Sequence, residues 1–364
     1  MRQNARVGAD RKLRVLLLFG GQSAEHDVSR ATAVAVARSL DPARYEVVPV
    51  GITSDGRWLL AADAQRMLAR GRDALPAAFA VQGELVPVPT VATRDALDVD
   101  VVIPMLHGPY GEDGTVQGLL ELAGLPYVGA GVLGSAVGMD KIAMKRMFAA
   151  SDLLTARYLT LREGHDGGAF ATRVERELGM PCFVKPANMG SSIGVSKVRT
   201  RAELDDAIAL ALTYDEWIVA EEFVRGREIE VAVLGDDPPE ASLPGEVRPA
   251  ADFYDYADKY EDGKAELLAP APLDEAETAA VRDLAVRAFE ACRGEAMARV
   301  DFFLRDDGVF LVNEVNTIPG FTPISMFPRL WEVSGVPYAE LLDRLIDLAI
   351  ARHERRARRA GRSR

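Results

Sequence analysis

The chain has 364 residues, of which 48% are hydrophobic, and its formal net charge is -12 at pH 7. This length and composition predict a globular protein of two or three packed domains. The acidic charge argues against a nucleic-acid partner, and no apolar run is long enough to span a membrane. The early run VLLLFG is too short for the apolar core of a signal peptide, so we expect a cytoplasmic protein.

Two features of the sequence are assigned no function. Cys182 and Cys292 have neither metal-site nor disulfide spacing, so we expect two ordinary buried thiols in a reduced compartment. The segment 353–364 is rich in arginine, and we expect a solvated, disordered tail there.

The N-terminal part alternates strand and helix patterns. KLRVLLLFGG predicts a buried strand and a Gly-Gly turn, SRATAVAVARSL a helix, and YEVVPVGIT a second strand. Residues 55–95 look irregular around one short helical piece. DVDVVIPMLHG then predicts another strand, and GTVQGLLELAGLPYVGAG a further helix and strand. The first 130 residues therefore predict an open, mostly parallel sheet with ligands at the carboxyl ends of its strands.

The remainder of the chain predicts two further α/β units. The glycine-rich run GAGVLGSAVGMDK predicts a hinge, followed by the helix DKIAMKRMFAAS, the strand-turn-strand CFVKPANMGSSIGVSKV, and the strands WIVAEEFV and REIEVAVLG. The loop DFYDYADKYEDGKAELL comes next. A helix over about 274–293, a hairpin, and a helix near 338–352 complete the chain.

The hairpin ARVDFFL-RDDG-VFLVNEVN carries the most informative side chains. If Leu304 faces Val309, Arg299 faces Glu314. Side chains alternate across a sheet, so Arg299, Asp301, Glu314 and Asn316 are expected on one face, with Asn313 on the other. Hard oxygen ligands of this kind bind magnesium together with phosphates. The alternative is an ordinary salt bridge on a solvated face.

A phosphate site and a nucleoside site are suggested by two other segments. Lys185 precedes a loop in which Gly190, Ser191 and Ser192 offer amides and hydroxyls to phosphate oxygens, although such a loop can also be a simple turn. Glu221 and Glu228 flank a turn between strands, where they would accept hydrogen bonds from an adenine amino group and ribose hydroxyls.

Taken together, the motifs resemble those of the D-alanine:D-alanine ligases of the ATP-grasp superfamily. The resemblance rests on FGGQSAEHDVS, MLHGPYGEDGTVQGLLELAGLPYVGAG, MDKIAMKRMF, VKPANMGSSIGVSKV, FYDYADKY, RVDFFL and NEVNTIPGFTPISMFP. It implies an α/β fold of three domains: a Rossmann-like open sheet over 1–129, ATP-grasp subdomains over 130–224 and 225–352, and the tail 353–364.

The resemblance also implies an activity, which is the ATP-dependent ligation of two D-alanines through an acyl phosphate for peptidoglycan precursors. Two Mg²⁺ or Mn²⁺ ions would be held by Asp301, Glu314 and Asn316. The ATP phosphates would be contacted by three lysines, namely Lys141, Lys185 and Lys259. Arg299 and the amide of Gly320 would form the oxyanion site.

For the amino-acid substrates, the resemblance assigns Glu25 to the ammonium group of the first D-alanine and His107 to its carboxylate. Ser325 and the amide of Met326 would hold the carboxylate of the second. Ser191, Tyr260 and Glu25 would form a hydrogen-bonded trio. The resemblance also implies that Tyr260 favours D-alanine over D-lactate as acceptor.

Three alternatives to this function remain open. Ligation of D-alanine to D-lactate or to D-serine differs only in the acceptor, and a mixed-substrate assay separates these products. A nucleotide-binding regulatory module without catalysis would release no phosphate in response to D-alanine. A homodimer is the assembly that the resemblance implies.

Overall fold

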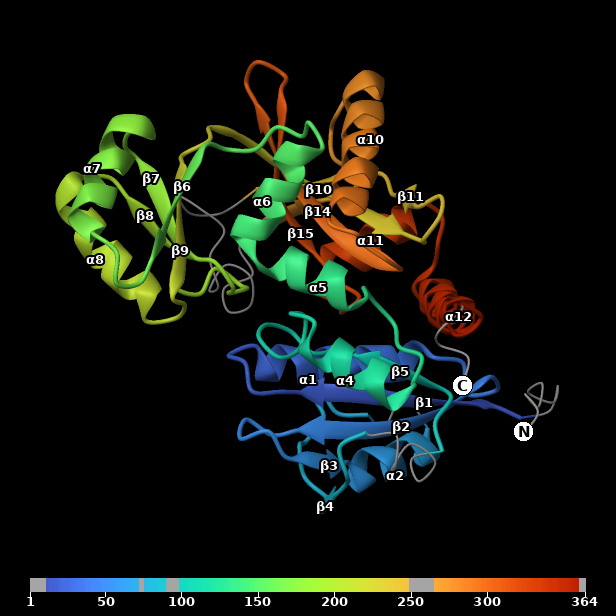
Figure 1. Ribbon diagram of the computed structural model, residues 1–364. Helices are drawn as coiled ribbons and strands as arrows, with labels where there is room; N and C mark the ends of the chain where they lie inside the picture. The colour runs from blue at the N-terminus through green and yellow to red at the C-terminus, as the bar shows by residue number, and fades with distance from the viewer. Residues whose placement is uncertain (1–10, 72–74, 90–97, 249–264, 360–364) are drawn as a thin grey trace.

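The computed structural model describes residues 11–71, 75–89, 98–248 and 265–359. These residues form three α/β units, each built on its own sheet (Figure 1). The mixed α/β class predicted from the sequence is confirmed. None of the helices in the described ranges is both long and apolar enough to cross a membrane.

The N-terminal sheet is mixed rather than mostly parallel. Its strand order is β4-β3-β2-β1-β5, in which β1 pairs in parallel with β2 and β5, whereas β3 pairs antiparallel with β2 and β4. The strands are β1 (Leu13–Gly20), β2 (Tyr45–Ile52), β3 (Trp58–Leu60), β4 (Glu84–Leu85) and β5 (Val101–Pro104). The predicted irregular region therefore contributes two short strands, of which β4 is at the edge of the sheet. They were missed because two or three residues are too few to establish an alternating pattern.

Helices α1 (His26–Ser39), α2 (Ala62–Arg70) and α4 (Thr115–Ala123) belong to the same unit. The predicted hinge after it is wrong, because Val132–Met139 forms helix α5. Its glycines allow close packing: a Cβ atom on Gly134 would lie 2.6 Å from the carbonyl oxygen of Arg293, and one on Gly138 would lie 2.8 Å from Cγ2 of Thr317. Helix α6 (Lys141–Ala150) follows at once, with Asp140 as its N-cap.

The central sheet is antiparallel, with the order β6-β9-β7-β8. Its strands are β6 (Tyr158–Arg162), β7 (Cys182–Pro186), β8 (Ser196–Val198) and β9 (Trp217–Glu222). Helices α7 (Gly167–Glu177) and α8 (Arg201–Leu212) pack against it (Figure 1). Cys182 is buried in this core, and Cys292 is buried in the next, both as free thiols, as the sequence predicted.

The third sheet has the path β13-β12-β10-β14-β15, and β11 also pairs with β10. The bounds are β10 (Gly226–Leu234), β11 (Glu240–Ala241), β12 (Gly245–Arg248), β13 (Glu266–Leu268), β14 (Met297–Arg305) and β15 (Phe310–Asn316). Helix α10 (Glu275–Ala291) packs on one face, where Val300 and Phe302 are buried. Helix α11 (Met326–Val333) contacts β10.

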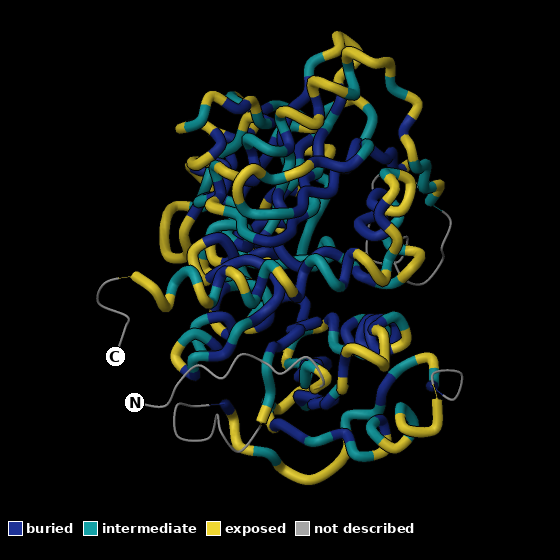
Figure 2. The backbone as a smooth tube through the Cα atoms, turned by 90° about the vertical axis from the view of Figure 1, so that its right-hand side faces the viewer, coloured by how far each residue is buried: buried dark blue, intermediate teal, exposed yellow. Residues whose placement is uncertain are grey.

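Helix α12 (Tyr338–Ala357) joins the C-terminal unit to the N-terminal one (Figure 1). Leu342 and Ile346 of α12 share one hydrophobic core with Val15 of β1 and Val36 of α1. Figure 2 shows that buried chain runs through the interior of both halves of the molecule, whereas exposed residues lie on the outer loops. Because α12 continues to Ala357, residues 353–357 of the predicted tail are helical.

Candidate active site

A cavity of about 910 Å³ is lined by residues from all three units. The start of α1 and the loop after β5 contribute from the N-terminal unit, β7 and β9 from the central sheet, and β10, β14, β15 and the start of α11 from the third. Every predicted site residue in the described ranges lines this cavity. These residues are Glu25, His107, Lys141, Lys185, Ser191, Glu221, Glu228, Arg299, Asp301, Glu314, Asn316, Gly320, Ser325 and Met326.

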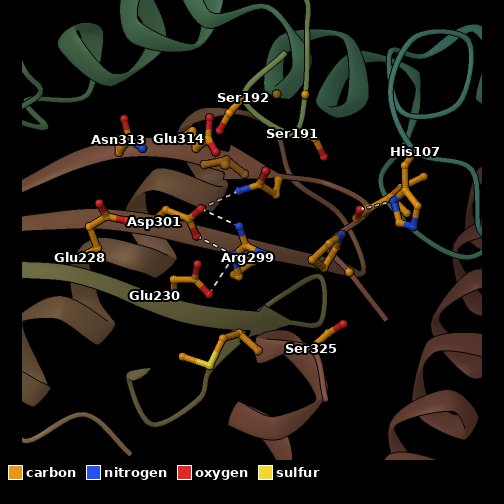
Figure 3. A pocket seen from close by; sticks show the side chains of 18 of the residues that line it. His107, Ser191, Ser192, Glu228, Glu230, Arg299, Asp301, Asn313, Glu314 and Ser325 are labelled. Carbon is orange, nitrogen blue, oxygen red and sulfur yellow. Dashed lines mark hydrogen bonds and ion pairs between the residues drawn. The ribbon is translucent and has the colours of Figure 1, made fainter. Parts of the chain in front are cut away.

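The hairpin β14–β15 has a different register from the predicted one. Arg299 lies opposite Asn316 and Asp301 opposite Glu314, and the register shifts between Asp301 and Phe302. This β-bulge adds one residue to β15, so Asn313 lines the cavity together with Glu314 instead of projecting from the opposite face. The four polar residues predicted for one face do line the same cavity (Figure 3).

Arg299 makes a two-pronged contact with Asp301. Its Nε donates to Oδ1 and its Nη2 donates to Oδ2, both at 2.7 Å. Glu230 Oε2 lies 3.2 Å from the same Nε. Burial by itself would lower the pKa of Arg299, but the Asp301 and Glu230 carboxylates outweigh it and hold that pKa well above its ordinary value. Arg299 is therefore a permanent cation in the cavity wall.

The predicted metal ligands form a compact oxygen set. Asp301 and Glu314 face each other across the hairpin, and Asn316 Nδ2 donates to Asp301 Oδ2 at 3.0 Å. Within the described ranges, no three His, Cys, Asp or Glu side chains gather into a metal cluster. Two carboxylates and one amide fit a hard cation that takes its remaining oxygens from a bound nucleotide and water.

The second charged group in the cavity centres on Glu221. Its Oε2 accepts from Lys185 Nζ at 2.7 Å, and its Oε1 lies 3.0 Å from Lys145 Nζ. Burial by itself would raise the pKa of Glu221, but the two lysines outweigh it and lower that pKa to about 2. Sequence reasoning missed Lys145. The available signal was its position one helical turn after Lys141 in KIAMK.

A loop with strained backbone lies beside these lysines. Ser191 and Ser192 have φ values of 49° and 58°, in the left-handed region that non-glycine residues rarely adopt. Lys141 Nζ donates to the carbonyl of Met189 in this loop at 2.6 Å. Ser191 Oγ donates to Glu25 Oε1, so the loop of the central unit is bonded to the N-terminal unit.

Glu25 belongs to a buried cluster at the carboxyl ends of β1 and β5. Burial lowers the pKa of His107, although the Glu25 charge acts in the opposite direction, and Nδ1 of His107 lies 3.2 Å from the carbonyl oxygen of Ile318. Sequence reasoning missed Glu112, which accepts from the amide of Gly108 at 2.8 Å. Burial, with Glu25 nearby, raises the pKa of Glu112 well above its ordinary value. Its signal was the motif GEDG after the strand.

The start of α11 forms another part of the cavity wall (Figure 3). Ser325 is the N-cap residue, but its side chain makes no capping hydrogen bond. Its Oγ lies 2.8 Å from Thr322 Oγ1 instead. The first amides of α11, beginning with Met326, are therefore not capped by Ser325, which suits them to an anionic ligand. A Cβ atom on Gly320 would lie 3.1 Å from Ser325 Oγ.

Two predicted residues are not placed here. Lys259 and Tyr260 lie outside the described residues. Glu228, on β10 opposite Phe303, lines the cavity.

Three α/β units around one cavity, with lysines from helix α6 and strand β7 on one side and a row of acids on the third sheet, define the ATP-grasp class of fold. Residues 14–130 match the family model described as D-ala D-ala ligase N-terminus, and residues 147–347 match the one described as D-ala D-ala ligase C-terminus. The chain belongs to the D-alanine–D-alanine ligase family.

Curated relatives and solved structures agree with this membership. The chain is 49% identical over 355 residues to a D-alanine–D-alanine ligase of Geobacillus thermodenitrificans, which covers 94% of this chain and 97% of that protein. It is similar in structure to the D-alanine-D-alanine ligase from Coxiella burnetii (TM-score 0.78, 36% identity, 95% and 96% of the two chains). It is also similar to the VanG D-Ala:D-Ser ligase from Enterococcus faecalis (TM-score 0.81, 33% identity, 93% and 100%).

Proposed function

We propose that the protein joins two D-alanine molecules into D-alanyl-D-alanine at the expense of ATP, for peptidoglycan precursors. The observation that carries this proposal is the single cavity in which the lysines of the central unit, the acids of β14–β15 and the first amides of α11 meet. This arrangement suits phosphoryl transfer to a small carboxylate more than a simple nucleotide sensor, because it includes anion-binding groups beyond those a nucleotide needs.

The reaction proceeds in two steps. A carboxylate is a poor electrophile, so the first D-alanine attacks the γ-phosphate of ATP and becomes an acyl phosphate, with ADP as the leaving group. The neutral amine of the second D-alanine then attacks the acyl carbon, and the tetrahedral intermediate expels inorganic phosphate. Two Mg²⁺ or Mn²⁺ ions, when bound by Asp301, Glu314 and Asn316, would neutralise the charge of the phosphates.

The side chains of the cavity then divide the remaining work. Lys141 and Lys185 are proposed to contact the phosphate oxygens. Arg299 and the amide of Gly320 stabilise the oxyanion that forms at the acyl carbon. Glu221, paired with two lysines, and Glu228 are proposed for the adenine amino group and the ribose hydroxyls.

Substrate orientation is assigned to two neighbouring parts of the cavity wall. Glu25 holds the ammonium group of the first D-alanine, and His107, a neutral donor at ordinary pH because burial lowers its pKa, supports the carboxylate. Ser325 and the amide of Met326 hold the carboxylate of the second. Lys259 and Tyr260 keep their predicted roles at the γ-phosphate and in the trio with Ser191 and Glu25.

Three further statements stay predictions. The cytoplasm is the expected location, because the reaction consumes ATP. The homodimer and the domain boundaries at 129/130, 224/225 and 352/353 come from the resemblance alone.

A phosphate-release assay with D-alanine and L-alanine tests the function. We expect ATP-dependent phosphate release with D-alanine only, together with one D-alanyl-D-alanine per phosphate by chromatography. Equal release with both enantiomers, or none, contradicts the proposal. D-serine and D-lactate in the same mixtures identify the acceptor, because a mixed product would form in place of the dipeptide.

A further inference from the structure

Three carboxylates lie in a row across the third sheet. Asp301 on β14 is directly opposite Glu230 on β10 and directly opposite Glu314 on β15. All three line the cavity, and Glu230 is only 6% exposed (Figure 3). Like charges directly opposite each other on neighbouring strands repel, so a row of three needs compensating positive charge on both sides of its centre.

Arg299 supplies positive charge on the Glu230 side of the row. It is two residues before Asp301 on β14, and its side chain lies between Asp301 and Glu230. The other side, towards Glu314 and Asn316, is where the proposed metal ligands gather. Glu230 therefore lies next to Arg299 and away from the proposed metal ligands. The family resemblance assigns it no role.

The geometry at Arg299 sets up a choice between two acceptors. Nε carries one hydrogen, so it donates fully to one carboxylate at a time. Asp301 now takes that hydrogen at 2.7 Å, and Glu230 Oε2 lies 3.2 Å from the same nitrogen. Both Asp301 oxygens are engaged by Arg299, and Oδ2 also accepts from Asn316. A cation that binds Asp301 must therefore compete with Arg299.

We infer that Glu230 is a positioning residue that takes over the Arg299 side chain when Asp301 turns to the metal-nucleotide. This inference rests on the proposed function. With Glu230 present, Asp301 is released without leaving a buried guanidinium unpaired, and Arg299 stays at the edge of the cavity where the oxyanion forms. Without it, Arg299 stays on Asp301 and opposes metal binding, or it loses its orientation.

Glu230→Gln tests the inference, since it keeps the shape of the side chain and removes its charge. We expect the Mg²⁺ or Mn²⁺ concentration that half-saturates ATP binding, measured by calorimetry without D-alanine, to rise about tenfold, the scale of one charge-assisted hydrogen bond. Turnover should fall by a similar factor at saturating metal, with little change in the KM for D-alanine. Glu230→Asp, which keeps the charge, should recover part of both losses.

Glu246→Gln is the matched control. Glu246 is a 3% exposed acid on β12 of the same sheet, and it accepts from Arg227 Nη2 at 2.8 Å, but it does not line the cavity. This variant loses a comparable ion pair, so its thermal midpoint should fall while metal binding and turnover stay at the parent level. If Glu246→Gln weakens metal binding as much as Glu230→Gln does, the effect is general destabilisation and the inference fails.

A double-variant cycle with Arg299→Met tests whether Glu230 acts by positioning Arg299 or only through its own negative charge. In that background, Glu230→Gln should have no further effect on metal binding, because the side chain it positions is gone. Equal weakening in both backgrounds would make Glu230 a source of charge or a metal ligand and would overturn the inference.

The binding measurements need no product, so a parent protein that binds Mg-ATP but makes no dipeptide refutes the proposed function separately.

Discussion

At the scale of single residues, the cavity is organised by carboxylates that each accept from more than one donor. Glu221 joins Lys145 and Lys185, and Asp301 joins Arg299 and Asn316. A buried carboxylate with one partner leaves lone pairs unsatisfied, whereas two partners satisfy both oxygens and fix both donors. Lys145 is almost fully buried and does not line the cavity, so it holds the Glu221 carboxylate from the protein interior. Lys185 contacts the same carboxylate from the cavity side.

The pairing of Glu221 predicts a specific pH dependence of stability. Its pKa falls from the ordinary 4.5 to about 2, so the ionised pair contributes on the order of 3 kcal/mol. This contribution is fully present above pH 4.5 and is lost as the pH falls towards 2. The difference in urea midpoint between the parent and Glu221→Gln should therefore be constant from pH 5 to 7 and shrink below pH 4.5. A constant difference down to pH 2.5 would contradict the pairing.

Arg299 predicts a catalytic loss without a binding loss. Arg299→Ala removes one donor of the proposed oxyanion site, and turnover should fall by roughly 10² to 10³. At saturating Mg²⁺, ATP affinity should stay near that of the parent, because the lysines that face the phosphates remain. Single-turnover kinetics with equilibrium ATP binding measure both quantities. Unchanged turnover would show that Arg299 only balances the neighbouring acids.

At the scale of elements, the hairpin marks the limit of what the sequence could predict about the site. The alternation of apolar and polar residues placed Arg299, Asp301, Glu314 and Asn316 together, and the structure agrees. The register was wrong by two residues at Arg299. One residue comes from the turn, because Leu304 pairs with Phe310 and not with Val309, and the other comes from the β-bulge, which depends on how a strand pairs with its neighbour. Asn313 was misplaced for the same reason.

Composition was equally misleading for helix α5. Glycines in the predicted hinge suggested flexibility, but Gly134 and Gly138 are needed where other backbone and side chains pass close by. The sequence shows that a glycine has no side chain, but it does not show which neighbouring atoms would clash with a Cβ atom at that position. The missed Lys145 and Glu230 have the same origin, since each acts through partners that are distant in sequence, Glu221 and Arg299.

The position of α11 depends on Gly245 in β12. A Cβ atom there would clash with the Met326 methyl group, and it would lie 2.8 Å from Leu330 Cδ2 and 3.1 Å from the carbonyl oxygen of Leu268. Gly245→Ala should displace the start of α11, lower stability by about 1–3 kcal/mol, and raise the KM for the acceptor D-alanine more than that for ATP.

Gly118→Ala in helix α4 is the control for Gly245→Ala. Nothing lies within 4 Å of its added Cβ atom, so stability should rise by up to about 1 kcal/mol and both KM values should stay unchanged. Thermal melts and initial-rate kinetics measure the pair. A Gly245→Ala protein with parent-like acceptor KM would mean that α11 does not set the acceptor site.

At the scale of the whole molecule, the N-terminal and C-terminal units are held together by α12. Arg352 is 3% exposed and donates to the carbonyl oxygens of Tyr127 at 2.7 Å and Gly129 at 2.6 Å. Tyr45 of β2 donates to Asp343 of α12 at 2.7 Å. The cavity depends on this attachment, since Glu25 and His107 come from the N-terminal unit.

Two truncations test the attachment. A chain ending at Ala357 keeps all of α12 and should melt like the parent. A chain ending at Ala351 loses Arg352 and leaves two buried carbonyls without their donor, which costs about 2–5 kcal/mol. Its thermal midpoint should fall by several degrees, and the KM for the first D-alanine should rise. Equal melting of the two truncated chains would show that Arg352 contributes little.

The shared core of β1, α1 and α12 has a consequence for biosynthesis. A ribosome delivers the chain from its N-terminus at about 5–20 residues per second, yet Val15 and Val36 pack with Leu342 and Ile346, which emerge near the end of translation. The first sheet must therefore wait for most of the chain with part of its apolar surface uncovered. Nascent chains stalled before residue 338 should be bound by chaperones more than released full-length protein, and they should be cleaved faster by proteases.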